Sequence, residues 1–471
     1  MNTSYAKAQA RRSILGHRAI WRWHFYAGLF CVPFVVVLAI TGSIYLFKPQ
    51  LEAWLDRPYD HLTLTGRPVS AEAQAAAALA AVPRSRLKAY EVRREADDAA
   101  RVTLGTAAGN VLVYVHPETN AVLKVLPEAR RLMEIDKTIH GELLLGDKGS
   151  ILVELAASWA IVMIVTGLYL WWPRQAQGLA GVLYPRLARG RTLFWRDLHA
   201  VTGVWISGLA LFLLLTGLPW TTVWNGGFKE VRRMTGTLEA RPDWSQGRAA
   251  EKAADHAEHD GMARMESMEH AAHGAAPLDR MAATVRALDL PPPVLIAPPS
   301  TAKGWRGSPA WTARSDTPNR PQRVTLTLDP ATGAVVGREG FAAKHPIDQV
   351  IGYGIAAHEG QLFGLANQLL GVAAALGLIL LSVSGFVIWW RRRPDGALGA
   401  PPPLPEGRLT AGLGLIILAL GLFLPVLGAS LIVVALIEAL VLKRLPGVRS
   451  WLGLRDTARE GGKSTASSSA L

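Results

Sequence analysis

The chain has 471 residues, of which 50% are hydrophobic and only 18% are charged. Soluble and disordered proteins of this length carry fewer apolar residues and more charge, so this composition excludes both classes. The formal net charge of +13 could indicate a nucleic-acid-binding protein, but much of the basic excess lies beside apolar segments, as the positive-inside rule predicts for membrane proteins. We therefore expect a multi-pass protein of the lipid bilayer with no nucleic-acid partner.

Apolar segments of about 20 residues, long enough to cross a bilayer, recur along the chain. Basic residues gather in the tail and the short loops, so these lie in the cytoplasm and the N-terminus with them. The long polar stretches then lie in the periplasm, which places the protein in a bacterial inner membrane. The expected segments are a basic tail over residues 1–24, spans over 25–47, 150–172, 200–222 and 365–390, outer stretches over 48–149 and 223–364, and basic loops over 173–199 and 391–408.

The apolar block after the fourth span is too long for a single crossing. Pro425 and Gly428 near its middle indicate a helical hairpin, because proline interrupts an α-helix. We expect its two short helices over 409–424 and 427–442, followed by a polar, serine-rich and disordered cytoplasmic tail over 443–471.

Tryptophans mark the ends of the spans. Their amphipathic rings favour the membrane–water interface, so we expect an interfacial belt with no role toward a cofactor. The belt residues are Trp21, Trp23, Trp171, Trp172, Trp195, Trp220, Trp389 and Trp390.

The spans form an internal repeat. His24 and His199 are 175 residues apart, and the same spacing separates Thr41-Gly42 from Thr216-Gly217. Spans two and four repeat at a spacing of 218 residues. The matched pairs there are His140 and His358, Gly146 and Gly364, Thr166-Gly167 and Ser384-Gly385, and Trp171-Trp172 and Trp389-Trp390.

The outer stretches repeat as well. Residues 113–122 and 326–335 both alternate in polarity around a turn, which predicts a β-hairpin in each. Each half is therefore expected to be a helix, an outer α+β domain and a second helix. Both halves begin on the same side, so the four-helix core is a parallel repeat about an axis along the membrane normal.

Four histidines occupy matched positions in this repeat. His24 and His199 lie at the cytoplasmic ends of spans one and three, whereas His140 and His358 precede spans two and four on the outer side. The symmetry sets each pair face to face, and two facing imidazoles are the ligands of a six-coordinate haem iron. Because the two levels are roughly 30 Å apart, we expect two haems. A Cys-x-x-Cys-His motif is absent, which excludes covalent attachment and favours haem b.

The four histidines are also consistent with roles that need no haem. They could cap helices or pair with Asp197 or Glu359, and zinc could replace haem, although each level offers only two imidazoles. Several charged residues lie near the expected haems. Arg18, Arg22 and Arg196 are candidate partners of the inner haem propionates, and Glu142 and Glu359 could orient the outer histidines or line a substrate approach.

A second cluster of potential ligands lies in the insertion over 256–273. Thioether and imidazole groups together suit soft copper, whereas a flexible insertion with incidental His and Met residues is the alternative. The candidate copper ligands are His256, His259, Met262, Met265, Met268, His270 and His273.

Together these motifs resemble the family of PepSY-associated transmembrane proteins, which includes inner-membrane ferric-siderophore reductases. The resemblance implies two periplasmic PepSY-like domains and haem b held by His24, His140, His199 and His358. It also implies reduction of chelated ferric iron on the periplasmic side. It rests on Trp23-His24 with Gly28 and Thr41-Gly42, on Ile139-His140-Gly141-Glu142, on Asp197-Leu198-His199 with Gly203, and on the Trp-Trp endings of spans two and four.

We therefore expect a di-haem b electron-transfer protein that reduces a periplasmic metal complex, foremost a ferric siderophore, in iron uptake. Nucleotide-binding motifs are absent, so a quinol or a separate cytoplasmic reductase would supply the electrons. The alternative is a non-enzymatic membrane-anchored binding module or a copper-handling protein that uses the His/Met-rich segment. Transport is less favoured, because Glu154 is the one acidic residue within the four main spans.

Overall fold

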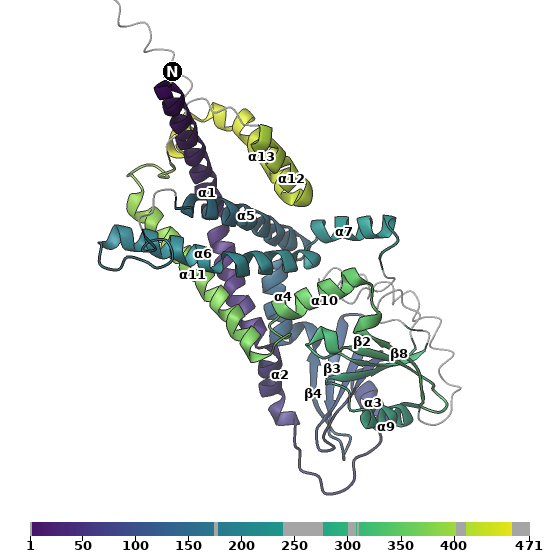
Figure 1. The fold of residues 1–471 in the computed structure, drawn as a ribbon. Helices are drawn as coiled ribbons and strands as arrows, with labels where there is room; N and C mark the ends of the chain where they lie inside the picture. Colours follow the sequence, from purple (N-terminus) through teal and green to yellow (C-terminus); the bar gives the residue numbers. More distant parts are fainter. Residues whose placement is uncertain are drawn as a thin grey trace, which may run out of the picture.

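In the computed structural model, the described residues are 2–173, 178–238, 277–299, 308, 310–401 and 411–454. Four long helices form a bundle, and a β-sheet lies beyond one end of it (Figure 1). We call this the sheet end of the bundle. The opposite end, where helix α6 begins and helix α11 ends, is called the basic end.

Each helix of the bundle is long and apolar enough to cross a membrane, which confirms four predicted spans. The first helix lies beside the second and the fourth, and the third packs against the same two. The first is longer than predicted because it continues through the basic tail without a break. The bundle consists of α1 (Asn2–Leu46), α5 (Asp147–Trp171), α6 (Arg191–Gly217) and α11 (Leu365–Arg392).

Shorter helices surround the sheet end of the bundle. Two of them, α4 (Leu132–Glu142) and α10 (Pro346–His358), directly precede α5 and α11 and carry the outer histidines. The sequence placed these residues in the outer stretches, before spans two and four, but did not predict them as separate helices. The remaining ones here are α2 (Lys48–Asp56), the 3₁₀ turn η1 (Arg57–Tyr59), η3 (Leu218–Trp220) and α7 (Val223–Met234).

The strands form a single antiparallel sheet in the order β4-β3-β2-β1-β5-β6-β7-β8. Both predicted hairpins are present, as β3–β4 and β7–β8. The expectation of two separate outer domains needs correction, because β1 pairs with β5 and joins the halves edge to edge. The strands are β1 (Arg86–Val92), β2 (Ala100–Thr106), β3 (Gly109–Val115), β4 (Val122–Pro127), β5 (Val294–Ala297), β6 (Trp311–Ser315), β7 (Val324–Leu328) and β8 (Val335–Gly340).

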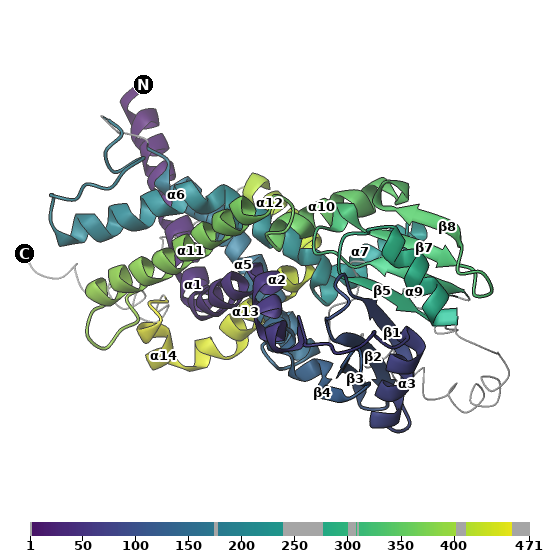
Figure 2. The ribbon, with the colours of Figure 1, turned by 90° about the horizontal axis from the view of Figure 1, so that it is seen from below.

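The two faces of the sheet differ in chemistry. Helices α3 (Ala71–Ala81) and α9 (Pro277–Ala287) cover the face away from the bundle, as the view from below shows (Figure 2). Their alanine, leucine and methionine side chains form the main hydrophobic core with alternate strand residues such as Val102, Ile296 and Leu326. Because strand side chains alternate, polar residues are left on the face toward the bundle.

Two buried charged side chains, Glu154 and Arg232, anchor α7 to the neighbouring helices α5 and α10. Glu154 of α5 accepts hydrogen bonds from the backbone N–H groups of Val223 and Trp224 at 2.8 and 2.9 Å. It thereby occupies the first turn of α7, where a negative charge is favoured. Arg232 of α7 forms a bidentate ion pair with Asp348 of α10, and both side chains are almost completely buried.

The C-terminal hairpin consists of α12 (Ala411–Phe423) and α13 (Pro425–Leu440). Leu424 and Leu427 at its turn pack against Ile161 and Val162 of α5. The expectation of a disordered tail beyond residue 443 is wrong as far as Leu454, because α14 (Pro446–Trp451) and the turn after it contact α1. This contact was not predictable from side-chain patterns, because the tail contributes backbone carbonyls, which accept from side chains of α1.

Candidate cofactor site

A cavity of about 3840 Å³ extends from the basic end of the bundle to the polar face of the sheet. His24 and His199 line it near the basic end, and His140 and His358 line it near the sheet end. We call these the inner pair and the outer pair. The structure therefore brings all four predicted histidines to one cavity.

The imidazoles of the inner pair face each other. The ring centres of His24 and His199 are 6.3 Å apart, and the ring planes are inclined by 82°. A metal ion between two imidazoles lies about 2 Å from each ligating nitrogen, which puts the ring centres roughly 6 Å apart. The observed spacing fits a metal held between these two side chains.

A threonine on the neighbouring helix determines which nitrogen of His24 can bind a metal. Thr166 Oγ1 lies 3.1 Å from His24 Nδ1 and donates its own proton to the carbonyl of Val162 at 2.8 Å. A hydroxyl has a single proton, so it accepts the hydrogen bond from the imidazole. His24 Nδ1 therefore carries a hydrogen, and Nε2 keeps the lone pair that a metal needs.

The same arrangement recurs at the other three histidines. In each case a hydroxyl of another helix meets Nδ1 and donates to a carbonyl of its own helix. At His199 the carbonyl of Leu381 also accepts from Nδ1, at 3.2 Å. The hydroxyl partners are Thr41 for His140 at 2.9 Å, Thr216 for His358 at 2.9 Å and Ser384 for His199 at 3.1 Å.

A glycine follows each of these hydroxyl residues and makes room for the ring. A Cβ built on Gly42 would lie 3.2 Å from His140 Cε1, and one on Gly167 would lie 3.1 Å from His24 Cε1. Gly385 meets His199 at 3.2 Å, whereas Gly217 leaves 3.6 Å to His358. The Thr-Gly step therefore forms a cradle for an imidazole: the hydroxyl accepts its hydrogen bond, and the glycine, which has no side chain, leaves space for the ring.

In the sequence, these Thr-Gly and Ser-Gly steps served only as marks of the repeat. Each step lies on a different helix from the histidine that it holds, so no local motif shows the contact. A signal was nevertheless present. Four histidines and four hydroxyl-glycine steps share the same two repeat spacings, so that each half contains two of each.

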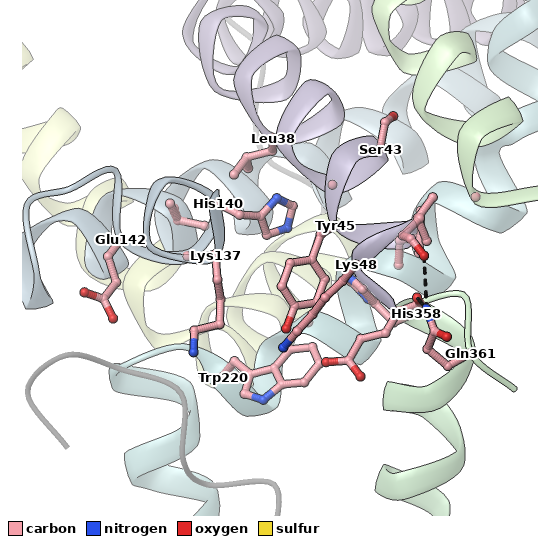
Figure 3. A pocket seen from close by; sticks show the side chains of 18 of the residues that line it. Leu38, Ser43, Tyr45, Lys48, Lys137, His140, Glu142, Trp220, His358 and Gln361 are labelled. Carbon is pink, nitrogen blue, oxygen red and sulfur yellow. Dashed lines mark hydrogen bonds between the residues drawn. The ribbon is translucent and has the colours of Figure 1, made fainter. Parts of the chain in front are cut away.

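Burial keeps the outer pair neutral. The pKa of both His140 and His358 is lowered to about 4, mainly by burial and, for His140, also by the charge interaction with His358. A neutral imidazole is the form that binds a metal. Figure 3 shows both rings in the same part of the cavity as Tyr45, Lys48 and Trp220.

Trp220 has a second role that the sequence did not predict. Its ring meets that of His358 edge-on, with centres 5.7 Å apart. Tyr45, which precedes Trp220 by the repeat spacing of 175 residues, lines the cavity at the same level. Trp21, Trp171, Trp220 and Trp389 line the cavity as well as marking the ends of the spans.

The arginines proposed for the inner haem propionates have other partners. Arg22 donates to the carbonyls of Pro401 and Gly453, and Arg18 is exposed. Arg196 lines the cavity but pairs with Asp197 at 3.1 Å. Asp197 therefore binds arginine, not a histidine.

Of the two roles expected for the acids near the outer pair, the structure agrees with a place in the cavity wall. Glu359 lies 3.8 Å from Arg320 and lines the cavity together with Glu142. The Nδ1–H group of each outer imidazole donates to a threonine hydroxyl, Thr41 for His140 and Thr216 for His358. Neither glutamate orients the Nδ1 atom of an outer histidine.

Between the outer pair and the sheet, the cavity widens into a cleft with basic walls. Arg86 and Lys88 of β1 and Arg314 of β6 line it, together with Arg323 at the start of β7. Acidic groups neutralise part of this charge, since Asp316 pairs with Arg314 at 3.0 Å and with Arg323 at 3.5 Å. We call this region the basic cleft.

The predicted copper ligands of residues 256–273 lie outside the described residues. Among the residues that the structure does describe, His61, Asp97 and Asp98 form the one group of His and acidic side chains close enough to share a metal ion. His61 is exposed and Asp98 already binds Arg93 at 3.0 Å. None of these three side chains lines the cavity.

The sequence of the chain matches the PepSY-associated TM region over residues 21–392. The match covers most of the chain, so the protein belongs to this family. It includes all four histidines and both halves of the sheet. No curated protein matches the chain.

Proposed function

We propose that this member of the PepSY-associated family binds two haem b groups and carries electrons across a bacterial inner membrane to a chelated ferric ion, foremost a ferric siderophore. The observation that carries the proposal is the fourfold cradle. Four imidazoles, two at each level of one cavity, are each held with Nδ1 protonated and Nε2 available. A membrane-anchored binding module without a cofactor has no need of this arrangement.

The residues present fit haem at both levels. His24 and His199 would hold one group, and His140 and His358 the other. Haem iron supplies reversible transfer of one electron. The polar hydroxyl groups hold the ligand rings in orientation, as hydrogen-bonding partners of metal ligands do in metalloproteins.

The basic cleft supports a negatively charged chelate as substrate. Arginine and lysine side chains bind carboxylate and hydroxamate oxygens through charge-assisted hydrogen bonds. Fe(II) binds hard oxygen ligands less tightly than Fe(III), so a chelate that gains one electron in the cleft releases its metal. Trp220 and Tyr45 stand between the outer pair and this cleft and would contact the chelate there.

The direction of electron flow follows from the distribution of charge. Arginines gather at the basic end, where α6 begins and α11 ends, and the positive-inside rule places this end in the cytoplasm. The sheet and the basic cleft would then lie in the periplasm. Electrons would enter at the inner pair and leave at the outer pair.

The test is reduction of a ferric chelate by the purified, pre-reduced protein. We expect stopped-flow mixing with ferric siderophore under anaerobic conditions to reoxidise the haem and to form Fe(II), trapped by a ferrous-specific dye. Arg86→Glu should weaken the preference of the reaction for an anionic chelate and leave the haem spectrum unchanged. A protein that contains haem yet transfers no electron to any ferric chelate would contradict the proposed substrate.

A further inference from the structure

We infer that the basic end of the cavity is a quinol-oxidation site, in which a membrane quinol binds beside His17 and Trp21 and delivers electrons to the inner pair. This inference rests on the proposed function. It identifies the electron donor, because the sequence did not distinguish between a quinol and a cytoplasmic reductase.

The first observation is a row of ring side chains on one face of α1. His17, Trp21 and His24 all line the cavity, and their spacing of four and three residues puts them on the same side of the helix. His17 lies seven residues before His24, about 10 Å along the helix axis. A ligand bound there would be next to the inner pair without occupying it.

The second observation is that the cavity meets the lipid-facing surface at this level. Trp21 lines the cavity and is still 40% exposed. The imidazole of His17 lies against the ring of Tyr169 on α5, with centres 6.3 Å apart, and Tyr169 is 38% exposed. Both helices are candidate membrane spans, so these exposed rings lie on the flank of the bundle, where a lipid-soluble ligand approaches.

The third observation concerns the aqueous side of the basic end. Gly399 and Pro401 form part of the cavity wall, and this loop is tied to the C-terminal segment. Leu398 N–H donates to the carbonyl of Trp451 at 2.9 Å, and Tyr26 Oη donates to the carbonyl of Leu452 at 2.6 Å. These hydrogen bonds hold the loop and the C-terminal segment beside the basic end of the cavity, where a cytoplasmic protein would have to dock.

A quinol matches both the apolar access and the polar groups. Its apolar tail would remain in the lipid beside Trp21, and its ring hydroxyl would meet the His17 imidazole. On oxidation the two O–H bonds of the quinol break and a quinone forms. One proton passes to a nitrogen of His17 and then to water, and the other passes directly to water. Each of the two electrons reduces one ferric ion to the ferrous state.

The test uses the full chain in lipid nanodiscs with decylubiquinol as the electron donor. We expect the quinol to produce the same reduced haem spectrum as dithionite. His17→Gln should slow the reduction of the haem by quinol at least tenfold, whereas its dithionite-reduced spectrum and its midpoint potentials should stay unchanged. Tyr169→Phe should weaken the binding of oxidised decylubiquinone, which is measured by the quenching of tryptophan fluorescence. The matched control is His61→Asn, which alters an exposed histidine with a φ of 53° that asparagine tolerates.

Several outcomes would overturn the inference. If dithionite reduces the wild-type haem but quinol does not, the donor is another molecule and the proposed haem function stands. If His17→Gln oxidises quinol at the wild-type rate, the site is elsewhere. If His17→Gln loses haem, His17 belongs to the haem pocket. A wild-type protein without haem would instead refute the proposed function itself.

Discussion

The hydroxyl that holds each imidazole is the residue on which the chemistry of the cavity depends most closely. Thr166→Val keeps the shape of the side chain but removes the acceptor for His24 Nδ1–H. Loss of such a partner of a metal ligand costs about 10–100-fold in metal affinity. We expect faster haem dissociation and a shifted midpoint potential at the inner level, measured by haem transfer to apomyoglobin and by redox titration.

Thr166→Ser is the control for this variant. It retains the hydroxyl, and Ser384 holds His199 in the same way in the other half. We expect it to behave like the wild type. Equal haem affinity in Thr166→Val and Thr166→Ser would show that the hydrogen bond does not matter.

The glycines of the cradles provide a second prediction with an internal comparison. A Cβ at Gly42 would lie 3.2 Å from His140 Cε1, whereas one at Gly217 would lie 3.6 Å from His358 Cε1, an ordinary contact. Gly42→Ala should therefore displace its imidazole and reduce haem content at the outer level. Gly217→Ala should retain haem, because only the first substitution crowds the ring. The reverse order of haem contents would contradict this geometry.

A pH dependence follows from Asp136 of α4. Its side chain is 5% exposed, and burial raises its pKa from 3.8 to about 6. Between these two pH values the folded protein binds more protons than the unfolded chain, so stability falls as pH rises through this window. Asp136→Asn removes the charge. Thermal unfolding should show this variant more stable than the wild type above pH 6 and equal to it near pH 4, and equal stability at both pH values would contradict the assignment.

At this scale the sequence predicted the histidines but not their partners. The histidines stood out because polar groups are rare in spans and recurred at matched positions. Thr and Gly are common residues in membrane helices, so Thr166 and Gly167 carried no comparable signal. Their role became visible only when α5 was placed beside His24 of α1.

At the scale of the elements, the contact between α7 and α10 leads to the clearest prediction about stability. Their contact depends on the ion pair between Arg232 and Asp348, with side chains 2% and 1% exposed. Removal of one partner of a buried pair costs about 3–5 kcal/mol, because the other charge stays buried. We expect Asp348→Asn to lower the midpoint of thermal unfolding clearly.

The matched control is the exposed pair between Glu230 and Arg233 on the same helix. Surface pairs contribute little, so Glu230→Gln should leave the unfolding midpoint unchanged. If both variants behaved alike, the buried pair would not be what fastens α7 to α10.

Element boundaries were predictable where hydrophobicity determined them. The four spans follow from length and composition, whereas α4 and α10 were placed in the outer stretches without being predicted as separate helices, because their apolar residues alternate with polar ones and are too few to mark a span. Glu154 stood out as an isolated acid within a span, yet its partners are backbone N–H groups of α7. Such a contact cannot be predicted from side-chain patterns, because every residue except proline offers a backbone N–H.

On the scale of the whole molecule, the repeat was predictable and its assembly was not. The equal spacings predicted two similar halves, and the structure contains both predicted hairpins, as β3–β4 and β7–β8. Nothing in either half indicated that β1 would pair with β5 into one sheet, because edge pairing depends on backbone groups exposed in each half. This pairing makes one basic cleft shared by both halves, placed over the outer pair.

Two haems held by the two histidine pairs would be visible in an absorption spectrum of the purified protein, oxidised and then reduced with dithionite, with haem quantified per chain. We predict about two haems per chain with the sharp reduced bands of bis-histidine b-type haem. His24→Ala and His358→Ala should each remove one haem and leave the other intact. Protein expressed with ample haem that contains none, or that keeps both haems in these variants, would contradict the proposed function at its base.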